Sequence, residues 1–517
     1  MPSPAAVNDG LAERFEAVIG LEIHVQLQTR TKLFCGCPNA FGGAPNSRTC
    51  PICLGMPGAL PILNEAAVRY ASRAALALGC AVNRRSRFAR KNYFYPDLPK
   101  GYQISQYDQP LAGEGRFELD FDGRRQGVRI IRLHLEEDAG KSIHDGMPRS
   151  ATDSYVDLNR CGVPLIEIVT APELRSAGEA VAFLSALRNT LLYLEVTDAS
   201  MEEGSLRCDA NISLRERGAA ALNPKTELKN LNSFRFLRQA LAFEIARQAA
   251  LLAAGEPLRQ GTRLFDERRG ETVAMRLKEE AHDYRYFPEP DLVPVALDDA
   301  ALAAAAAEVP ELPLARFDRF VAAPAASDLS DVSRARGPGA EGERGGVAGY
   351  GLSADAAAEL VQDRARADYF EAMVAAGAPP AAAGNWVRME IGRWLNEHVG
   401  DMAAFPVPAA EMAALLRAVA DGTVAAAVAG QVMDRMAETG RAAADIIAGE
   451  GFRQISASGE LAPIVDAVLA AHPDEVAAFR GGREQVFGFL IGQVMKATQG
   501  KANPDTVRRL VRAGLER

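Results

Sequence analysis

The 517-residue sequence has no apolar run long enough to cross a bilayer, and its N-terminus has no charged segment followed by an apolar one. A membrane-spanning helix needs about 20 mostly apolar residues, and a secretory signal needs both parts of the second pattern. These absences argue against a membrane protein and against a secreted one. We therefore expect a cytoplasmic protein with no membrane partner.

The sequence is also poor in cysteine and has no excess of positive charge. Its seven cysteines are an odd number, which suits a reducing compartment better than a disulfide framework. The net charge is −9, whereas a protein dedicated to duplex nucleic acid is usually basic. Any contact with nucleic acid must therefore depend on local basic patches.

The length of the chain predicts several domains. Up to about residue 297 the sequence contains short alternating runs with helical periods between them, which is typical of an α+β domain built on an antiparallel sheet. After residue 298 it turns alanine-rich, and helical patterns dominate. We predict a first domain over 1–297, an all-α helical domain over 298–448 with a flexible insertion at about 322–349, and a small helical tail domain over 449–517.

The stretch from Val18 to Gln28 alternates strictly between apolar and polar residues. This period of two predicts a half-buried strand with one polar face. On that face Glu22 and His24 are two residues apart, so both side chains project into the same space. Such a pair suits a divalent cation or a proton relay, although a solvated strand face with an incidental contact would have the same pattern.

Two further segments place acidic residues where strands are expected. One is Arg132–Ser142, which contains Glu136 and Glu137, and the other is an apolar strand interrupted by Glu167. A lone glutamate inside an apolar strand is costly unless it is paired or bound to a metal. We therefore favour a carboxylate-rich magnesium site over scattered ion pairs. Its predicted ligands are Glu22, His24, one of Glu136 and Glu137, and Glu167.

Four of the cysteines form two close pairs. Cys35 and Cys37 are separated from Cys50 and Cys53 by twelve residues, with glycines and prolines nearby. Two such pairs in a cytosolic protein predict a four-thiolate zinc site, although a spacing of two residues within the first pair would be commoner. Because four thiolates leave no open position on the metal, this zinc would be structural.

Three stretches combine basic, aromatic and polar side chains: Arg90–Gln106, Met201–Ser213 and Lys225–Arg235. Aromatic rings interleaved with lysines can bind a nucleotide or a single-stranded RNA end through stacking and charge. A polar hairpin with core tyrosines would have the same composition, so both interpretations stay open.

Residues 496–517 form a basic segment at the end of an acidic chain. They include six basic and two acidic residues, a net charge of +4. Asn503 and Pro504 predict the start of a helix there. A solvated helix face and a surface that contacts phosphates explain this segment equally well. The cations concerned are Lys496, Lys501, Arg508, Arg509 and Arg512.

Several longer motifs occur in order along the chain, and together they resemble the B subunit of the bacterial aspartyl/glutamyl-tRNA amidotransferase over nearly its whole length. They are Val18–His24, Arg90–Asp97, Leu135–Ser142, Val156–Arg160, Met201–Arg215, Lys229–Ser233, Asp283–Asp291 and Gly488–Pro504.

The resemblance implies a catalytic domain with a fold like that of glutamine synthetase, which uses ATP without a phosphate loop. It assigns Mg²⁺ to Glu22, His24, Glu137 and Glu167, and it adds Lys91 as a catalytic residue. Strand alternation favours Glu136 as the partner of His134, so choosing Glu137 implies a β-bulge or a strand end at this point.

The reaction implied is phosphorylation by ATP of the side-chain carboxylate of Glu-tRNA(Gln) or Asp-tRNA(Asn), followed by amidation with ammonia. A separate glutaminase subunit supplies the ammonia, and a small third subunit completes a heterotrimer. The basic tail would contact the tRNA body. The expected contacts to ATP or to the tRNA 3′ end are Tyr93, Tyr95, Lys100, Ser205, Arg207 and Asn211.

Two other classes of function stay open. A non-catalytic tRNA-binding scaffold would have no metal near Glu22 and Glu167. A stand-alone ATP-dependent carboxylate-amine ligase would act without tRNA, which the basic C-terminus argues against.

Overall fold

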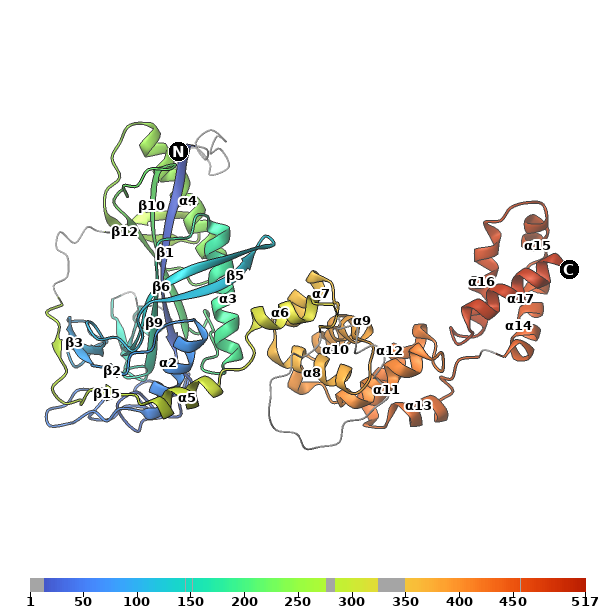
Figure 1. Cartoon of the computed structure of the whole chain (residues 1–517), viewed down its shortest axis with the longest axis horizontal. Helices are drawn as coiled ribbons and strands as arrows, with labels where there is room; N and C mark the ends of the chain where they lie inside the picture. Colours follow the sequence, from blue (N-terminus) through green and yellow to red (C-terminus); the bar gives the residue numbers. More distant parts are fainter. Residues whose placement is uncertain (1–13, 145, 151, 276–283, 324–348, 456) are drawn as a thin grey trace. The chain divides into compact units, whose positions relative to one another are not determined.

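A computed structural model describes residues 14–144, 146–150, 152–275, 284–323, 349–455 and 457–517 (Figure 1). The chain forms two compact units, divided between Leu314 and Ala315. Nearly all of the predicted insertion at 322–349 lies outside the described residues. In the described ranges, every helix is too short or too polar to span a bilayer.

The first unit is built on an eight-stranded sheet with the strand order β13-β12-β11-β10-β1-β9-β6-β5. All neighbours in this sheet are antiparallel except β11 and β12, which run parallel. The strands are β1 (Phe15–Gln26), β5 (Gly115–Phe121), β6 (Arg124–Glu137), β9 (Pro164–Thr170), β10 (Leu206–Glu216), β11 (Thr226–Lys229), β12 (Gly261–Asp266) and β13 (Glu271–Ala274).

The long strand β1 lies near the middle of this sheet, between β10 and β9. Its alternation is as predicted, because Ile19, Leu21, Ile23 and Val25 are at most 1% exposed while Glu22 and His24 are partly accessible. The apolar face packs against three helices, α2 (Glu65–Ala77), α3 (Ala177–Tyr193) and α4 (Phe234–Ala253). Figure 1 shows α3 and α4 together beside the sheet. The other face of the sheet therefore carries the polar side chains.

Three smaller sheets are found among the described residues of this unit, in the orders β14-β3-β4, β15-β2 and β7-β8. Ser105 of β4 donates a hydrogen bond to the Glu136 carboxylate of β6 (2.9 Å), so the first of these sheets lies beside the polar face. Their strands are β2 (Arg85–Ser86), β3 (Ala89–Asn92), β4 (Tyr102–Ser105), β7 (Lys141–Ile143), β8 (Tyr155–Asp157), β14 (Phe287–Pro288) and β15 (Val295–Ala296).

Helix α5 (Asp299–Ala307) packs on α2 within the first unit, where Arg73 pairs with Glu308 at 2.9 Å. Asp298 caps this helix by accepting a hydrogen bond from the Ala301 amide. The first unit therefore extends to residue 314, past the boundary that we predicted at 297.

The second unit is helical, as the alanine-rich composition predicts. Its described residues form two separate apolar cores, one between Phe320 and Ile447 and one between Leu461 and Leu515. Its helices are α6 (Pro313–Val321), α7 (Ala354–Leu360), α8 (Arg364–Ala375), α9 (Pro380–Trp386), a π-helical turn (Val387–Ile391), α10 (Gly392–Glu397), a 3₁₀ turn (Met402–Ala404), α11 (Ala409–Ala420), α12 (Ala426–Thr439), α13 (Ala443–Gly449), α14 (Ser458–Ala471), α15 (Pro473–Arg480), α16 (Val486–Ala497) and α17 (Pro504–Glu516).

The last helix, α17, begins where the sequence predicts. The Asn503 side chain accepts hydrogen bonds from the amides of Asp505 and Thr506, and Pro504 occupies the first turn. Together, a large and mostly antiparallel sheet followed by a helical region confirm the predicted mixed architecture. The proposed division of the second unit near residue 449 stays a prediction.

Candidate active site

Three polar side chains meet in one row across neighbouring strands of the large sheet. In register, His24 of β1 lies opposite Glu167 of β9, and Glu167 lies opposite His134 of β6. Directly paired residues point to the same face of a sheet, and residues two apart on one strand do as well. Glu136 therefore joins this group from β6. We call His24, His134, Glu136 and Glu167 the acid–imidazole cluster.

The distances in this cluster suit a shared cation. His24 Nε2 lies 3.4 Å from Glu167 Oε2 and 3.6 Å from Glu136 Oε1. Ligand atoms of His24, Glu136 and Glu167 all lie within 4.8 Å of one another. Two carboxylates and one imidazole form a donor set that a hard divalent cation accepts.

Burial and mutual attraction set the protonation of the cluster. Burial by itself lowers the pKa of His134, but its hydrogen bonds and charge interactions with Glu136 and Glu167 outweigh burial and raise this pKa to about 9. For Glu167, burial favours the neutral acid, but the two imidazoles hold the pKa of its carboxyl well below the usual range. Without a cation, the imidazoles therefore supply the positive charge that the two carboxylates require.

The raised pKa of His134 makes the stability of the cation-free protein depend on pH. A group whose pKa is higher in the folded state stabilises fully below its unfolded pKa, about 6.5, and loses this contribution as the pH rises through about 9. In chelator-treated protein we expect the unfolding free energy to fall by about 3 kcal/mol over that interval. Urea denaturation at a series of pH values measures this, and His134→Gln should flatten the profile.

Glu137 lies outside the cluster, so the ligand set implied by the resemblance, which includes Glu137, stays a prediction. Its carboxylate pairs with the Lys100 ammonium and accepts a hydrogen bond from the Ile104 amide (2.9 Å). The β6–β9 register runs unbroken from Arg132 to Glu137, and its one shift lies between Ile130 and Arg132. Because no bulge separates the two glutamates, alternation directs Glu136, not Glu137, toward His24.

Glu22 lies on the same face as His24, two residues along β1. Its carboxylate accepts a hydrogen bond from Asn211 Nδ2 (2.9 Å), and it lies opposite Asp209 of β10. Glu22 does not belong to the set of ligand atoms within 4.8 Å of one another. The structure thus places it beside the cluster, on the side of β10.

Cationic side chains border the cluster on the β10 side. Arg207 lies opposite His24 in register and binds the Asp138 carboxylate at 2.7 Å. Further along the sheet, Lys229 contacts the carboxylates of Asp209 (2.9 Å) and Glu227 (3.0 Å). The polar face of the large sheet therefore carries both carboxylates that can bind a cation and basic side chains that can bind an anion.

The other predicted contacts of ATP or RNA are spread over two regions. On the small sheet, the Lys91 ammonium lies 4.9 Å from the centre of the Tyr284 ring and 5.8 Å from that of Tyr93, which itself lies edge-on to Tyr95 at 5.8 Å. At the start of β10, the Ser205 hydroxyl accepts a hydrogen bond from the Ser200 amide (2.8 Å). Ser205 thus has a local structural partner, and Lys100 is already paired with Glu137.

Several members of the polar face are not evident from the sequence. The local pattern marks His134 only as a neighbour of Glu136, and it does not single out Asp209 or Lys229. Their position depends on strand register, which pairs Glu22 with Asp209 and His134 with Glu167. Residues so distant in the chain offer no local signal for these pairings.

The four predicted zinc cysteines come together in the first unit. The sulfur atoms of these cysteines all lie within 4.8 Å of one another; the four are Cys35, Cys37, Cys50 and Cys53. Four thiols at this separation fit a tetrahedral zinc ion. The Lys32 ammonium, 3.7 Å from the Cys53 sulfur, adds a positive charge that favours thiolates.

We expect freshly prepared, reduced protein to contain one zinc ion per chain, measured by elemental analysis. Cys50→Ser should remove the metal and lower the melting temperature, because the remaining sulfurs would no longer be joined through a common zinc ion. Cys80→Ser, at a buried cysteine outside the cluster, is the control. Retention of zinc by the Cys50 variant would contradict a four-cysteine site.

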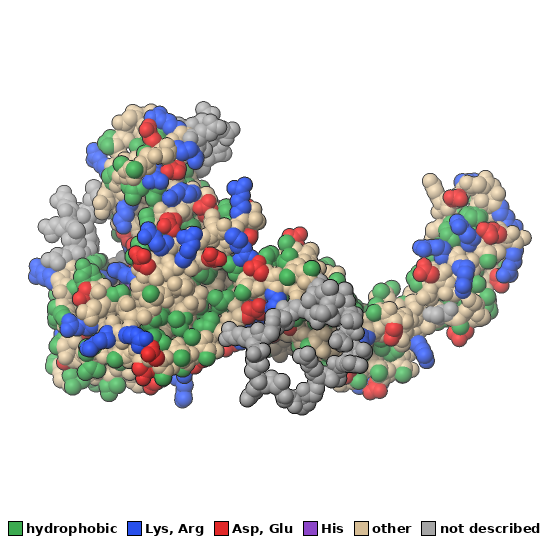
Figure 2. Space-filling model, viewed as in Figure 1, with side chains coloured by type: hydrophobic (Ala, Val, Ile, Leu, Met, Phe, Trp, Pro, Cys, Tyr) green, Lys and Arg blue, Asp and Glu red, His purple; other side chains and the backbone are tan. Residues whose placement is uncertain are grey.

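In the second unit, the predicted tail cations lie on three elements. Arg508, Arg509 and Arg512 are exposed on α17, Lys496 is exposed on α16, and Lys501 is partly accessible between them. Figure 2 shows Lys and Arg side chains on the surface of this region, with acidic side chains among them. The described cations are thus accessible to a ligand, as a phosphate-binding surface requires.

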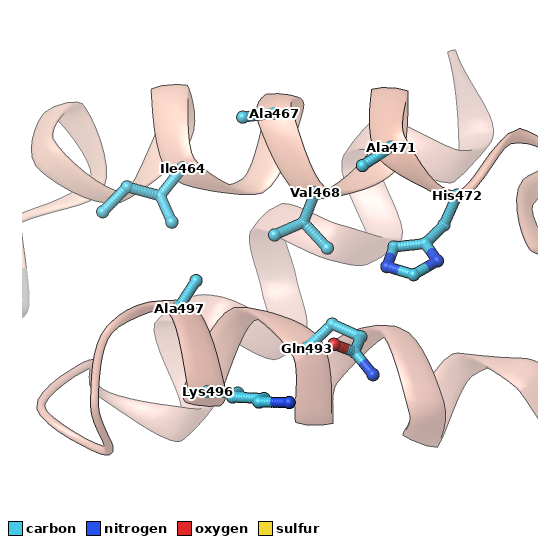
Figure 3. A pocket seen from close by; sticks show the side chains of 8 residues that line it. All are labelled: Ile464, Ala467, Val468, Ala471, His472, Gln493, Lys496 and Ala497. Atoms are coloured by element: carbon cyan, nitrogen blue, oxygen red, sulfur yellow. The ribbon is translucent and has the colours of Figure 1, made fainter.

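A groove of about 490 Å³ lies between α14 and α16 in the same region. Figure 3 shows apolar side chains and His472 on one side and Gln493 and Lys496 on the other. The lining residues are Ile464, Ala467, Val468, Ala471, His472, Gln493, Lys496 and Ala497. Of the five predicted tail cations, Lys496 lines this groove.

Comparisons with known proteins match both units of the chain. The family model described as the GatB/GatE catalytic domain matches residues 17–303, and the one described as the GatB domain matches residues 368–515. The relatives carry the name of the B subunit of aspartyl/glutamyl-tRNA(Asn/Gln) amidotransferase. The one from Anaeromyxobacter dehalogenans (strain 2CP-1) is 50% identical, over 97% of this chain and 99% of its own length.

The relative from Geobacter sulfurreducens is 48% identical, over 96% of this chain and 98% of its own length. The relative from Myxococcus xanthus is 47% identical, over 97% and 98%. Identity at this level over nearly complete chains covers both units of the structure. The chain therefore belongs to the family of the B subunit of aspartyl/glutamyl-tRNA(Asn/Gln) amidotransferase.

Proposed function

We propose that this chain works within a tRNA-dependent amidotransferase, where it phosphorylates with ATP the side-chain carboxylate of Glu-tRNA(Gln) or Asp-tRNA(Asn). The observation that carries the proposal is the acid–imidazole cluster, with cationic side chains at its border on the same sheet face. The names of the curated relatives support the same activity. On this account the chain is part of a ligase that forms carbon–nitrogen bonds.

His24, Glu136 and Glu167 would hold a magnesium ion. When bound, this ion supplies positive charge that stabilises the phosphate oxygens during transfer. Arg207 and Lys229 would bind anionic oxygens of the substrates and orient them above the cluster. The polar face thus has groups for both the cation and the anions of a phosphoryl transfer.

The chemistry explains why phosphorylation comes first. A carboxylate is a poor electrophile, and its oxygen can attack the γ-phosphorus of ATP to form an acyl phosphate while ADP leaves. Ammonia then attacks the acyl carbon, and phosphate leaves with the former carboxylate oxygen. One nitrogen has replaced one oxygen, and the product is Gln-tRNA(Gln) or Asn-tRNA(Asn).

The remaining parts of the proposal concern fold and partners. The sheet and its polar face would correspond to the catalytic fold of glutamine synthetase, and zinc would hold the four-cysteine loop. A glutaminase subunit would deliver the ammonia, and a small third subunit would complete the heterotrimer. The tail from about residue 449 to 517 would bind the tRNA body through its exposed cations.

An amidation assay with the reconstituted complex tests this function. We expect both mischarged tRNAs, or one of them, to be amidated when ATP and Mg²⁺ are present, and neither when one of these is left out. Amidation of a free carboxylate without tRNA would favour the stand-alone ligase instead. Binding of tRNA without any ATP turnover would favour the scaffold.

A further inference from the structure

The four-cysteine site lies close to the end of β6, where Glu137 follows Glu136. We call residues 50–58, which carry Cys50 and Cys53, the cysteine loop. Between this loop and β6 lies the ion pair of Lys100 and Glu137, whose side chains are only 6% and 2% exposed. The pair is therefore shielded from solvent on both sides.

Gly55 brings the backbone of the cysteine loop against Lys100. A Cβ atom added at Gly55 would lie 2.1 Å from Lys100 Cγ, 2.9 Å from its Cβ and 3.1 Å from its Cα. Distances this short leave no room for a methyl group unless Lys100 moves. The cysteine loop is thus packed directly against the aliphatic part of the Lys100 side chain, whose ammonium pairs with Glu137.

Gly162 and Lys32 make a second connection between the loop and β6. A Cβ atom at Gly162 would lie 3.4 Å from Cys53 Cβ and 3.8 Å from Glu137 Oε2. The Lys32 side chain is fully buried and donates to the Arg48 carbonyl (2.8 Å) as well as approaching Cys53. A small cavity of about 50 Å³ lies beside these contacts, and its lining includes Cys53, Gly55, Lys100 and Glu137.

The charge of Lys100 matters because Glu136 and Glu137 are adjacent buried carboxylates. A buried carboxylate that loses its partner must protonate, move or recruit another cation, each at a large cost in free energy. Lys100 neutralises Glu137 on the side of the cysteine loop. Glu136 on the opposite face then has Ser105 (2.9 Å) and the two imidazoles as its partners.

We propose that the cysteine loop, when it holds zinc, positions the cation site through Lys100, which fixes Glu137 and thereby the end of β6 that carries Glu136. Lys100 is then a positioning residue for the phosphoryl transfer, and zinc supports catalysis as well as folding. The inference rests on the proposed function, which is tested separately by the amidation assay on the wild-type complex.

The first test compares two glycines of the same loop in the full chain, assembled with its partner subunits. Gly55 and Gly58 both have positive φ, +66° and +81°, but a Cβ atom at Gly58 meets nothing within 4 Å. Backbone strain is therefore common to both alanine variants, and contact with Lys100 is specific to one. We expect Gly55→Ala to weaken Mn²⁺ binding, measured by electron paramagnetic resonance, about tenfold relative to Gly58→Ala, with zinc retained in both.

The second test leaves the loop unchanged. Lys100→Met keeps the length of the stem but leaves Glu137 buried without its cation. It should weaken Mn²⁺ binding and raise the Mg²⁺ concentration for half-maximal turnover at least tenfold. The double variant Lys100→Met with Glu137→Gln removes both charges, and the new amide oxygen at position 137 can still accept the hydrogen bond of the Ile104 amide. The end of β6 then stays in place without a buried unpaired charge, so these values should return to within about threefold of the wild type.

Two results would overturn the inference. One is equal Mn²⁺ binding and turnover in the Gly55 and Gly58 variants at full zinc content. The other is a double variant no better than Lys100→Met alone, which is the result expected if Glu137 were itself a cation ligand. Because both tests compare variants with an active wild-type complex, failure of the inference is distinct from failure of the proposed function.

Discussion

Glu167→Gln should lower the rate of ATP-dependent carboxylate phosphorylation by about 10³-fold, the loss typical when one stabilising group is removed from a preorganised site. Glu167 is the central member of the acid–imidazole cluster, since its Oε2 lies 3.4 Å from both His24 Nε2 and His134 Nε2. An amide has the same shape but no charge to offer a cation. Phosphorylation should be measured as release of ADP in the presence of mischarged tRNA.

Glu173→Gln provides the matched control for this prediction. Glu173 lies just beyond β9, and its carboxylate contacts Arg129 near the surface rather than the cluster. This control should keep wild-type turnover, and circular dichroism should show an intact fold for both variants. Wild-type ADP release by the Glu167 variant would remove the cluster from the mechanism.

Replacing Arg508, Arg509 and Arg512 by glutamine should weaken tRNA binding by about 10²-fold at 0.1 M salt while ATP turnover in the first unit survives. Each phosphate contact releases counterions from the nucleic acid, so three lost contacts should reduce the salt slope of log K by about 2 to 3. Contacts of this kind position the ligand and do not read its bases. Filter binding or fluorescence anisotropy over a range of salt concentrations measures both quantities.

The triple replacement of the same arginines by lysine is the control, because lysine keeps the charge and loses only the forked geometry of the guanidinium. All three arginines also contact neighbours, since Arg508 pairs with Asp505 (3.5 Å), Arg509 donates to Ser458 and Arg512 lies over the Phe487 ring. The lysine variant should retain most of the affinity and the salt slope. If the glutamine variant matches the wild type in both, the tail has another role.

Local sequence patterns predict much of this fold because strands and helices follow from the spacing of apolar residues. The alternation from Val18 to Gln28 predicts β1, and the apolar spacing after Asn503 predicts α17 together with its cap. The spacing of four cysteines likewise predicts the sulfur cluster. Each of these features depends on residues that are close together in the chain.

The active-site geometry is harder to predict because it depends on strand register. Alternation alone favours Glu136, and in the structure Glu136 points to His24 while Glu137 points to Lys100. His134 lies opposite Glu167 only if β6 and β9, about thirty residues apart in the chain, pair in one particular register. The pairing of Lys100 with Glu137 depends on tertiary packing, which cannot be predicted from the spacing of apolar residues.

The most direct test of the central claim follows oxygen atoms through the reaction. The reconstituted complex is given ATP, ammonia or glutamine, and a mischarged tRNA in which both oxygens of the side-chain carboxylate are ¹⁸O. If the chain activates that carboxylate as an acyl phosphate, each amide formed should release one inorganic phosphate that contains ¹⁸O. Amide formation with unlabelled phosphate, or with ¹⁸O in AMP, would contradict the account.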